Sequence, residues 1–217
     1  YYFDNKNKKH YLIRDRVGQK PLYYGITDSF LIFSSNLDSV KQLIKPSTVD
    51  FKQLNNYIKY GIVGGQNTMY KNIFKVLPAE IIEINFSDKV DINRKKYWDI
   101  STKVDNQEFD LEEFFSIFTE SVELRLSADV PIANFLSGGL DSTSIIKNMY
   151  EKNKSINTFT VGSDSEKYDE SKWAKIVSEK YNTNHHELIV DNNVFGMVPE
   201  LIYYYGEPFA DSSSIPT

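Results

Sequence analysis

The chain has 217 residues, enough for one large domain or two small ones, and its hydrophobic share of 41% is enough to bury a core. A net charge of −5 argues against general nucleic-acid binding. The sequence contains no apolar run of about 18 residues that would predict a membrane span, and no basic leader that would predict a secretion signal. Without Cys, this chain has no disulfides, thiolate nucleophiles or Cys-ligated metals. We therefore expect a soluble, cytoplasmic protein.

The first 98 residues predict mostly antiparallel β-structure. Short β-rich runs separated by turn residues lie at 1–3, 11–13, 22–26, 30–34, 73–77, 81–84 and, after a turn at 85–91, 97–98. Helical spacing predicts helices at 37–44 and 51–60, the second beginning after Asp50 and ending at Gly61. The charge-dense stretch from Arg14 to Arg16 is typical of a structural ion-pair cluster.

The pattern changes after a polar stretch at residues 99–110, which we interpret as a linker between domains. Helices and strands then alternate: a helix capped by Asp110, a strand ending at Leu136, a helix at 142–152, a strand at 158–161, a helix at 170–181, a strand at 186–190 and a helix at 194–205. Strands separated by helices predict an α/β fold, with a Rossmann-like parallel sheet flanked by helices.

Ligands of such sheets bind beyond the carboxyl ends of the strands, and a glycine pair follows the strand that ends at Leu136. Gly138 and Gly139 let backbone N–H groups approach a phosphate closely. Ser137 and Ser142 add hydroxyl donors, and we expect Ser142 to cap a helix that starts after Asp141.

An acidic residue in an anion-binding loop suggests a bridging divalent cation. Asp141 would repel bare phosphate, so we expect Mg²⁺ to bind between its carboxylate and the phosphate oxygens. A glycine turn with an ordinary helix cap is the alternative interpretation of residues 137–142. At the second strand end, Val161 and Gly162 either form a wall for an adenine ring or a simple tight turn.

Three well-known loops are excluded by inspection. The sequence has no Gly-x-x-x-x-Gly-Lys phosphate loop, Gly138 does not begin a Gly-x-Gly-x-x-Gly fingerprint, and Ser137 is not in a Gly-x-Ser-x-Gly elbow. The remaining pattern, Ser-Gly-Gly-x-Asp-Ser, resembles the PP-loop of ATP pyrophosphatases, which cleave ATP between its α and β phosphates.

The wider chain resembles one branch of that superfamily, the glutamine-dependent asparagine synthetases. Matching stretches lie at residues 14–24, 33–35, 97–98, 127–131, 159–162, 168–171, 185–187 and 207–213, besides the loop itself. The resemblance implies that residues 1–98 are the carboxyl-terminal part of an Ntn-type, class II glutamine amidotransferase domain. Residues 111–217 would be the amino-terminal part of an ATP-dependent synthetase domain, with the linker between them.

In the activity that this resemblance implies, ATP adenylates the side-chain carboxylate of aspartate, and ammonia from glutamine displaces AMP. The implied cofactors are ATP and Mg²⁺, and a homodimer is compatible with the family. Residues implied to hold pyrophosphate and Mg²⁺, with Asp141 as the metal ligand, are Ser137, Gly138, Gly139, Asp141 and Ser142. Residues implied to contact the adenosine are Leu136, Val161 and Gly162. Residues implied near the substrate are Glu207, Asp211, Ser213 and Ser214.

The chain also departs from the family pattern. It starts at Tyr1 instead of the catalytic Cys, and the second glycine-rich acidic loop would follow Thr217, so we expect a segment of a longer protein that is inactive alone. Ala79-Glu80 stands where the family usually has Pro-Gly, which predicts a differently shaped connection. Gly206 stands where the family commonly has an acidic residue before Glu207.

Two functional alternatives remain open. The same architecture can amidate another carboxylate, such as a sugar acid, because the loop fixes the nucleotide and not the acceptor. A non-enzymatic scaffold that binds nucleotides is the other alternative. A metal site at His185 and His186 is disfavoured, because adjacent residues on a strand point to opposite faces.

Overall fold

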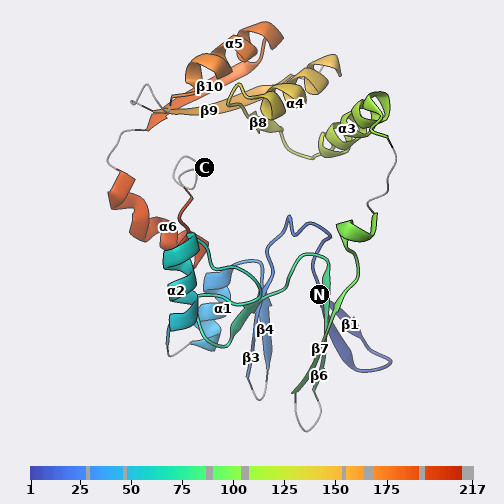
Figure 1. Ribbon diagram of the computed structural model, residues 1–217, viewed down its shortest axis with the longest axis vertical. Helices are drawn as coiled ribbons and strands as arrows, with labels where there is room; N and C mark the ends of the chain where they lie inside the picture. The colour runs from blue at the N-terminus through green and yellow to red at the C-terminus, as the bar shows by residue number, and fades with distance from the viewer. Residues whose placement is uncertain are drawn as a thin grey trace. The chain divides into compact units, whose positions relative to one another are not determined.

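The computed structural model describes residues 1–27, 30–45, 48–86, 90–103, 108–152, 155–163, 169–190 and 194–211. The chain forms two compact units. Unit 1 contains residues 1–105 and the described part of 195–215, and unit 2 contains residues 106–194 (Figure 1). No helix in the described residues is long and apolar enough to cross a membrane. Ser213 and Ser214 lie outside the described residues, as do 104–107 of the predicted linker.

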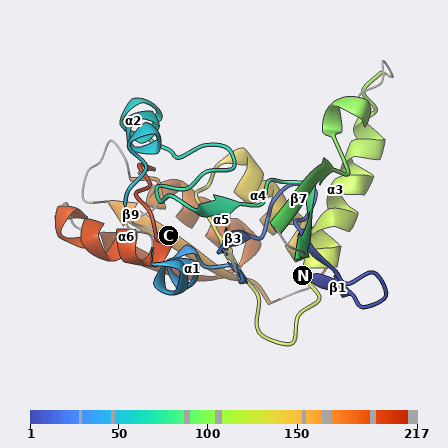
Figure 2. The same cartoon turned by 90° about the horizontal axis from the view of Figure 1, so that it is seen from below.

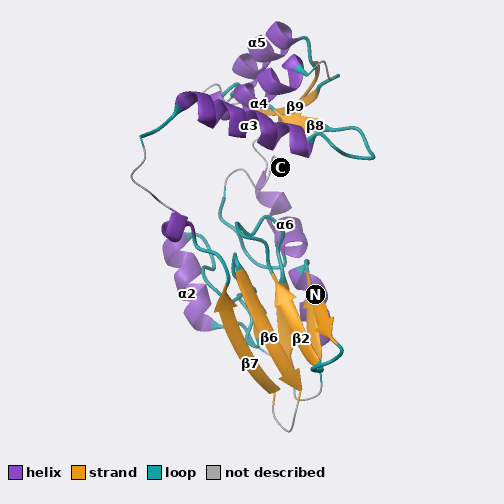
Figure 3. Ribbon diagram, turned by 90° about the vertical axis from the view of Figure 1, so that its right-hand side faces the viewer, coloured by secondary structure: helices purple, strands orange, loops and turns teal. Residues whose placement is uncertain are grey.

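Unit 1 contains two antiparallel sheets. The first has the order β1-β2-β6-β7, with β1 (Tyr2–Asp4), β2 (Lys9–Ile13), β6 (Glu80–Phe86) and β7 (Val90–Lys96). Figure 3 shows β2, β6 and β7 side by side. The second has the order β4-β3-β5, with β4 (Leu31–Ser34), β3 (Tyr23–Ile26) and β5 (Ile73–Lys75). These sheets confirm the predicted antiparallel character of this half.

The core of unit 1 follows from alternation along the strands. Ile82 and Ile84 occupy alternate positions of β6 and are fully buried, together with Leu12 of β2. They pack with Tyr24 of β3 and Val76, so both sheets contribute to one apolar cluster. Because neighbouring side chains on a strand point to opposite faces, this alternation also fixes the register of β6.

Two helices of unit 1 have the predicted bounds. α1 (Leu37–Ile44) begins after Asn36, whose side chain accepts a hydrogen bond from the Ser39 N–H. α2 (Phe51–Tyr60) begins after Asp50, which accepts from the Lys52 N–H, and ends at Gly61 in the left-handed region.

Two predictions for unit 1 are wrong. The last strand is β7 (Val90–Lys96) and ends before the predicted pair at residues 97–98, because the polar residues of β7 lie on an exposed edge strand and obscure its alternation. Arg14 forms no ion-pair cluster among the described residues: its guanidinium donates to the carbonyls of Lys20, Val76 and Gly18 instead.

Unit 2 contains a three-stranded parallel sheet in the order β10-β9-β8. Its elements are α3 (Leu111–Arg125), β8 (Ala133–Phe135), α4 (Leu140–Glu151), β9 (Asn157–Ser163), α5 (Ser171–Tyr181) and β10 (Asn184–Val190). Residues of α4 and α5 share one apolar cluster with Leu136, so both helices cover the same face. The predicted α/β sheet with helical crossovers is confirmed.

The last helix belongs to unit 1, not to the parallel sheet. A 3₁₀ helix, η2 (Val194–Met197), leads into α6 (Val198–Tyr205), which lies beside α1 (Figures 1 and 2). Another short 3₁₀ helix, η1 (Ile100–Lys103), occupies part of the predicted linker. The unit boundary therefore differs from the boundary between the amidotransferase and synthetase segments that the resemblance implies.

Candidate functional site

The glycine loop starts from a firmly bonded point at the carboxyl end of β8. The Leu136 N–H donates to the Phe159 carbonyl over 2.9 Å, and the Leu136 carbonyl accepts from the Thr160 hydroxyl. The Leu136 side chain is 1% exposed and belongs to the core of unit 2. The neighbouring strand β9 thus fixes where the loop leaves the sheet.

Gly138 has no room for a side chain. Its φ is +80°, and a Cβ atom there would lie 2.5 Å from both the backbone carbon and the Cβ of Trp173 in the first turn of α5. Gly139 has an ordinary φ of −70°, and its nearest obstacle would be the Ser137 hydroxyl at 3.3 Å. The close packing against α5 therefore requires glycine at the first position only.

The helix after the loop begins earlier than predicted. α4 starts at Leu140 with Gly139 as its N-cap, and no side chain caps it. Ser142 is therefore not the cap: its hydroxyl donates to the Gly139 carbonyl over 3.3 Å and lies 3.2 Å from the Ser137 hydroxyl. The first backbone N–H groups of α4 keep their hydrogen-bonding capacity for a bound anion.

Asp141 lies in the exposed first turn of α4, beside these N–H groups. Within the part of the chain that the structure describes, no hydrogen bond or ion pair engages its carboxylate. One carboxylate with two nearby hydroxyls suits Mg²⁺, which usually binds to one or two carboxylates and takes its other ligands from phosphates and water. The residues present thus fit a magnesium–phosphate ligand.

The residues expected at the adenosine lie on β9 and at its neighbour. Val161 and Gly162 lie within β9, which continues to Ser163, so they do not form a turn. Gly162 is buried, and a Cβ there would lie 2.7 Å from Ile189. Val161 is on the opposite face and is half-buried. Since the Leu136 side chain is buried, Leu136 can offer a ligand only its backbone.

A turn before α5 completes this edge of the sheet. Asp169 accepts hydrogen bonds from the N–H and the hydroxyl of Ser171, where α5 begins. These bonds hold the pKa of Asp169 below its ordinary value of 3.8. The same carboxylate approaches the Cα of Gly162 closely, since a Cβ there would lie 3.0 Å from it.

Comparisons with known proteins cover almost the whole chain. Residues 1–98 match the family model of the glutamine amidotransferase domain, and residues 113–217 match that of asparagine synthase. Each match covers slightly less than half of the chain, and together they cover nearly all of it. Both matches agree with the resemblance stated from the sequence.

Three relatives show how far the similarity extends. A protein of Methanocaldococcus jannaschii, provisionally named a glutamine-hydrolyzing asparagine synthetase, is 31% identical over 99% of this chain and 43% of its own length. Asparagine synthetase (glutamine-hydrolyzing) 1 of Bacillus subtilis is 28% identical over 95% of this chain and 33% of its own. Amidase chyE of Penicillium rubens is 28% identical over 61% of this chain and 20% of its own. The chain thus spans less than half the length of these relatives.

Glu207 is in the segment that matches asparagine synthase, but it belongs to unit 1 and not to the unit that contains the glycine loop. Its carboxylate pairs with Lys75 and accepts a hydrogen bond from the Met69 N–H. Asp211 is described and exposed. Sequence reasoning missed Lys75, although a lone cation in the apolar run at residues 73–77 was a usable signal. It also missed Trp173, for which the sequence offers no signal.

The two histidines on β10 point to opposite faces, as expected. His185 lies 2.9 Å from the Thr158 hydroxyl on the buried face, and His186 stacks on Phe159 with ring centroids 4.9 Å apart. The described residues contain no group of three or more His, Cys, Asp or Glu side chains that could hold a metal ion.

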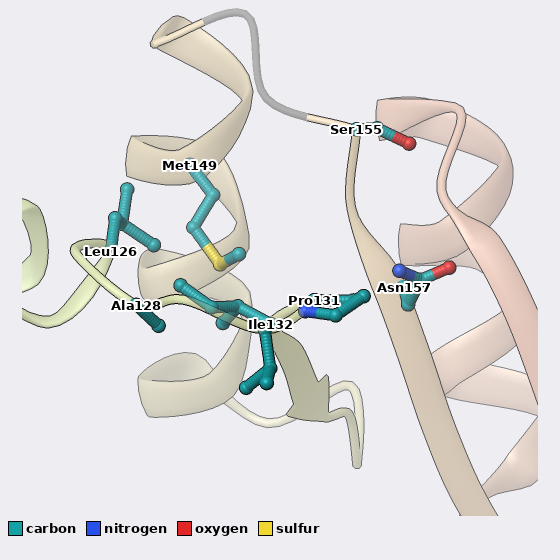
Figure 4. Close-up of a pocket in the computed structure, with 8 residues that line it drawn as sticks. Leu126, Ala128, Pro131, Ile132, Met149, Ser155 and Asn157 are labelled. Carbon is teal, nitrogen blue, oxygen red and sulfur yellow. The ribbon is translucent and has the colours of Figure 1, made fainter.

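A hollow of about 360 Å³ in unit 2 lies at the other end of the sheet from the loop (Figure 4). Pro131 and Ile132 precede β8, Asn157 begins β9, and Met149 of α4 forms another wall. Because the nucleotide loop follows the carboxyl end of β8, this hollow is not part of the candidate site.

Proposed function

We propose that the full-length protein makes asparagine: it adenylates the side-chain carboxylate of aspartate with ATP and then transfers ammonia from glutamine. The families of the two segments and the names of the relatives support this assignment. The observation that carries it is the loop at the end of β8, where the Ser137 and Ser142 hydroxyls lie 3.2 Å apart and the uncapped first turn of α4 contains Asp141.

The chemistry has two balanced steps. A carboxylate oxygen of aspartate attacks the α-phosphorus of ATP, and the bond to the bridging oxygen of the β-phosphate breaks to release pyrophosphate. Ammonia then attacks the carbonyl carbon of the acyl adenylate, AMP leaves, and the nitrogen loses a proton. The first step needs groups that bind the leaving pyrophosphate, because its negative charge grows as the bond breaks.

This chain's residues suit that task. The N–H groups of Leu140 and Asp141 point out of the start of α4, and the helix dipole favours an anion there. The hydroxyls of Ser137 and Ser142 are within reach of the same anion. Mg²⁺ bound at Asp141 would offset charge on the phosphates. The buried Leu136 backbone and the tight approach of Gly138 to α5 keep the loop from moving away.

The remaining assignments follow from the family. Val161, Gly162 and the backbone of Leu136 would lie near the adenosine, and Asp211, Ser213 and Ser214 near the aspartate. Glu207 belongs to the same implied substrate group, and its carboxylate is bonded to Lys75 and to the Met69 N–H. We place the reaction in the cytoplasm, where ATP and Mg²⁺ are available.

The test is substrate-dependent AMP formation by the full-length protein. With ATP, Mg²⁺ and glutamine, we expect AMP and asparagine to form when aspartate is added, and little AMP without it. Activity with a sugar acid or another carboxylic acid but not with aspartate would contradict the proposal and favour a related amidotransferase. No AMP with any acid would favour a nucleotide-binding scaffold.

A further inference from the structure

The end of the asparagine synthase segment is anchored in the unit that holds the amidotransferase segment. Glu207 is only 8% exposed. Its Oε1 lies 2.6 Å from the Lys75 Nζ, and its Oε2 accepts from the Met69 N–H over 2.8 Å. Both carboxylate oxygens are therefore bonded to residues of the amidotransferase segment.

Lys75 is held in place from its other side. Its ammonium also donates to the Val63 carbonyl over 2.8 Å, so the charge lies between a carboxylate and a backbone dipole. The Lys75 and Glu207 side chains are only 18% and 11% exposed. Burial and the nearby Glu207 carboxylate also raise the pKa of Tyr23 above its ordinary value of 10.0. Removing either member of the pair would leave an uncompensated charge in a poorly solvated place.

The residues on either side of Glu207 also contact unit 1. Gly206 ends α6 with a φ of +78°, and a Cβ there would lie 2.8 Å from the Leu37 Cβ of α1. The Ala210 N–H donates to the Gly61 carbonyl over 3.1 Å. A side chain at position 206 would not fit this arrangement, so the packing against α1 explains Gly206.

A cavity of about 330 Å³ borders the ion pair. Tyr23, Tyr205 and Phe209 form part of its wall, together with Lys75 and Glu207. The pair is thus not sealed in the core, and the cavity leaves space for the two side chains to separate.

We propose that Lys75 and Glu207 form a latch that couples glutamine hydrolysis to synthesis, an inference that rests on the proposed function. The chain passes from β10, a strand of the nucleotide-binding sheet, into unit 1 at residue 195. The latch fixes the segment 198–211 to the amidotransferase unit. Both residues are positioning residues, because they act by holding this segment and not by contacting ATP.

The test compares two nitrogen donors in the full-length protein. AMP formation is measured with aspartate and either glutamine or ammonium chloride, and glutamate release is measured separately. For Lys75→Met we expect the ratio of glutamine-supported to ammonia-supported AMP formation to fall about 5-fold or more, which is the lower end of typical coupling. We expect glutamate release to stay unchanged, because the latch acts on the coupling and not on the hydrolysis of glutamine itself.

Two further variants make the result specific. Glu207→Gln should lower the same ratio, although the two residues belong to different family segments. The double variant Lys75→Gln/Glu207→Gln leaves no lone charge, so it tests the latch even if a single variant fails to fold. As a matched control, Glu83→Gln removes the 2.7 Å pair with Lys9 in the sheet of unit 1 and should leave the ratio unchanged.

The outcomes separate the two proposals. An unchanged ratio in a folded Lys75→Met protein overturns the latch alone. Equal loss with both donors also overturns it, since that pattern indicates a direct role in synthesis. If the unmodified protein forms no AMP with either donor, the proposed function fails, and the coupling fails with it.

Discussion

Gly138 is the position where a single added methyl group tests the candidate site. We expect Gly138→Ala to destabilise unit 2 by about 1–3 kcal/mol, because the new Cβ meets the Trp173 backbone and the positive φ strains alanine. The loop would have to shift away from α5, so ATP affinity should fall as well. Thermal unfolding and calorimetric titration with Mg-ATP measure the two effects.

Gly139→Ala is the matched control for that variant. Its Cβ would face only the Ser137 hydroxyl, which can rotate, and its φ suits any residue. A loss of stability as large as that of Gly138→Ala would show that the contact with Trp173 does not hold the loop.

A variant of Asp141 tests whether AMP formation and glutamine hydrolysis depend on separate family segments. In the full-length protein, Asp141→Ala should abolish aspartate-dependent AMP formation, because Mg²⁺ held there would lose its carboxylate ligand. Glutamine hydrolysis should continue at nearly the original rate, measured as glutamate release. If a folded variant loses both activities, the two reactions do not depend on separate residues.

At this scale the sequence predicted the position of the loop at the end of a strand better than its packing. The glycine pair and Asp141 were identified because each residue type limits what it can bind. The predicted N-cap was Ser142, whereas the observed N-cap is Gly139. Serine and glycine both occur at helix starts, so only the backbone geometry distinguishes them. Trp173 and Met69 reach the sites through backbone atoms, which carry no sequence signal.

Among the secondary-structure elements, β9 controls where β8 releases the loop. Thr160→Val should cost about 1–3 kcal/mol in unfolding free energy, because the buried Leu136 carbonyl loses the Thr160 hydroxyl as a donor. We expect nucleotide affinity to weaken too, since that carbonyl precedes the loop. Chemical denaturation and Mg-ATP titration provide both measurements.

Thr143→Val is a control with the same change of side chain. The Thr143 hydroxyl is buried and has no hydrogen-bond partner in the described structure, so its removal should be neutral or stabilising. Equal destabilisation by the two variants would mean that the loss reflects the side-chain exchange and not the bond to Leu136.

The start of α5 should respond to pH through Asp169. Its pKa is lower in the folded state than its ordinary value of 3.8, so the unfolded chain binds the proton more readily. This stabilisation is therefore complete above about pH 3.8 and is lost as the pH falls through the folded pKa. We expect Asp169→Asn to flatten the acid limb of the stability curve, measured by denaturation at several pH values. An unchanged limb would contradict the role of the Ser171 hydrogen bonds.

Element boundaries were predictable where a local signal marks them. α1 and α2 have caps encoded by single residues, and their predicted bounds hold. β7 was missed because an exposed edge strand needs little apolar sequence, so its pairing with β6 comes from distant residues. β9 and β10 also extend beyond their predicted apolar runs, because their pairing with each other continues through polar residues such as Asn157 and Asn184.

For the chain as a whole, one face of the parallel sheet is covered by no described helix of unit 2. Phe135, Phe159 and Leu188 lie on the face away from α4 and α5, and they are 64%, 42% and 62% exposed. Parallel sheets are normally covered on both faces. We expect this 217-residue chain to self-associate and to bind a hydrophobic dye, and Phe135→Ser/Phe159→Ser to reduce both, measured by light scattering and fluorescence.

Phe30→Ser is the control for this face. Phe30 is similarly exposed but belongs to unit 1 and not to the parallel sheet. If it lowers dye binding as much as the double variant does, general surface hydrophobicity and not the open sheet face is responsible.

The partition of the chain into units was the least predictable feature. The composition shift near residue 99 marks one boundary, but nothing in the residues around 195 indicates a return to unit 1. That return depends on Glu207 meeting Lys75 and on Gly206 meeting Leu37, contacts between residues more than 100 positions apart.

Because α6 packs against α1 of unit 1, the chain cannot be divided into independent halves at the linker. An amino-terminal half produced without α6 would expose Leu37 and leave the Lys75 charge without its partner. A carboxyl-terminal half would carry α6 with no surface to receive it. Each half therefore contains the binding partner of the other, and co-expressed halves should associate without a covalent link, as split proteins do when they reassemble.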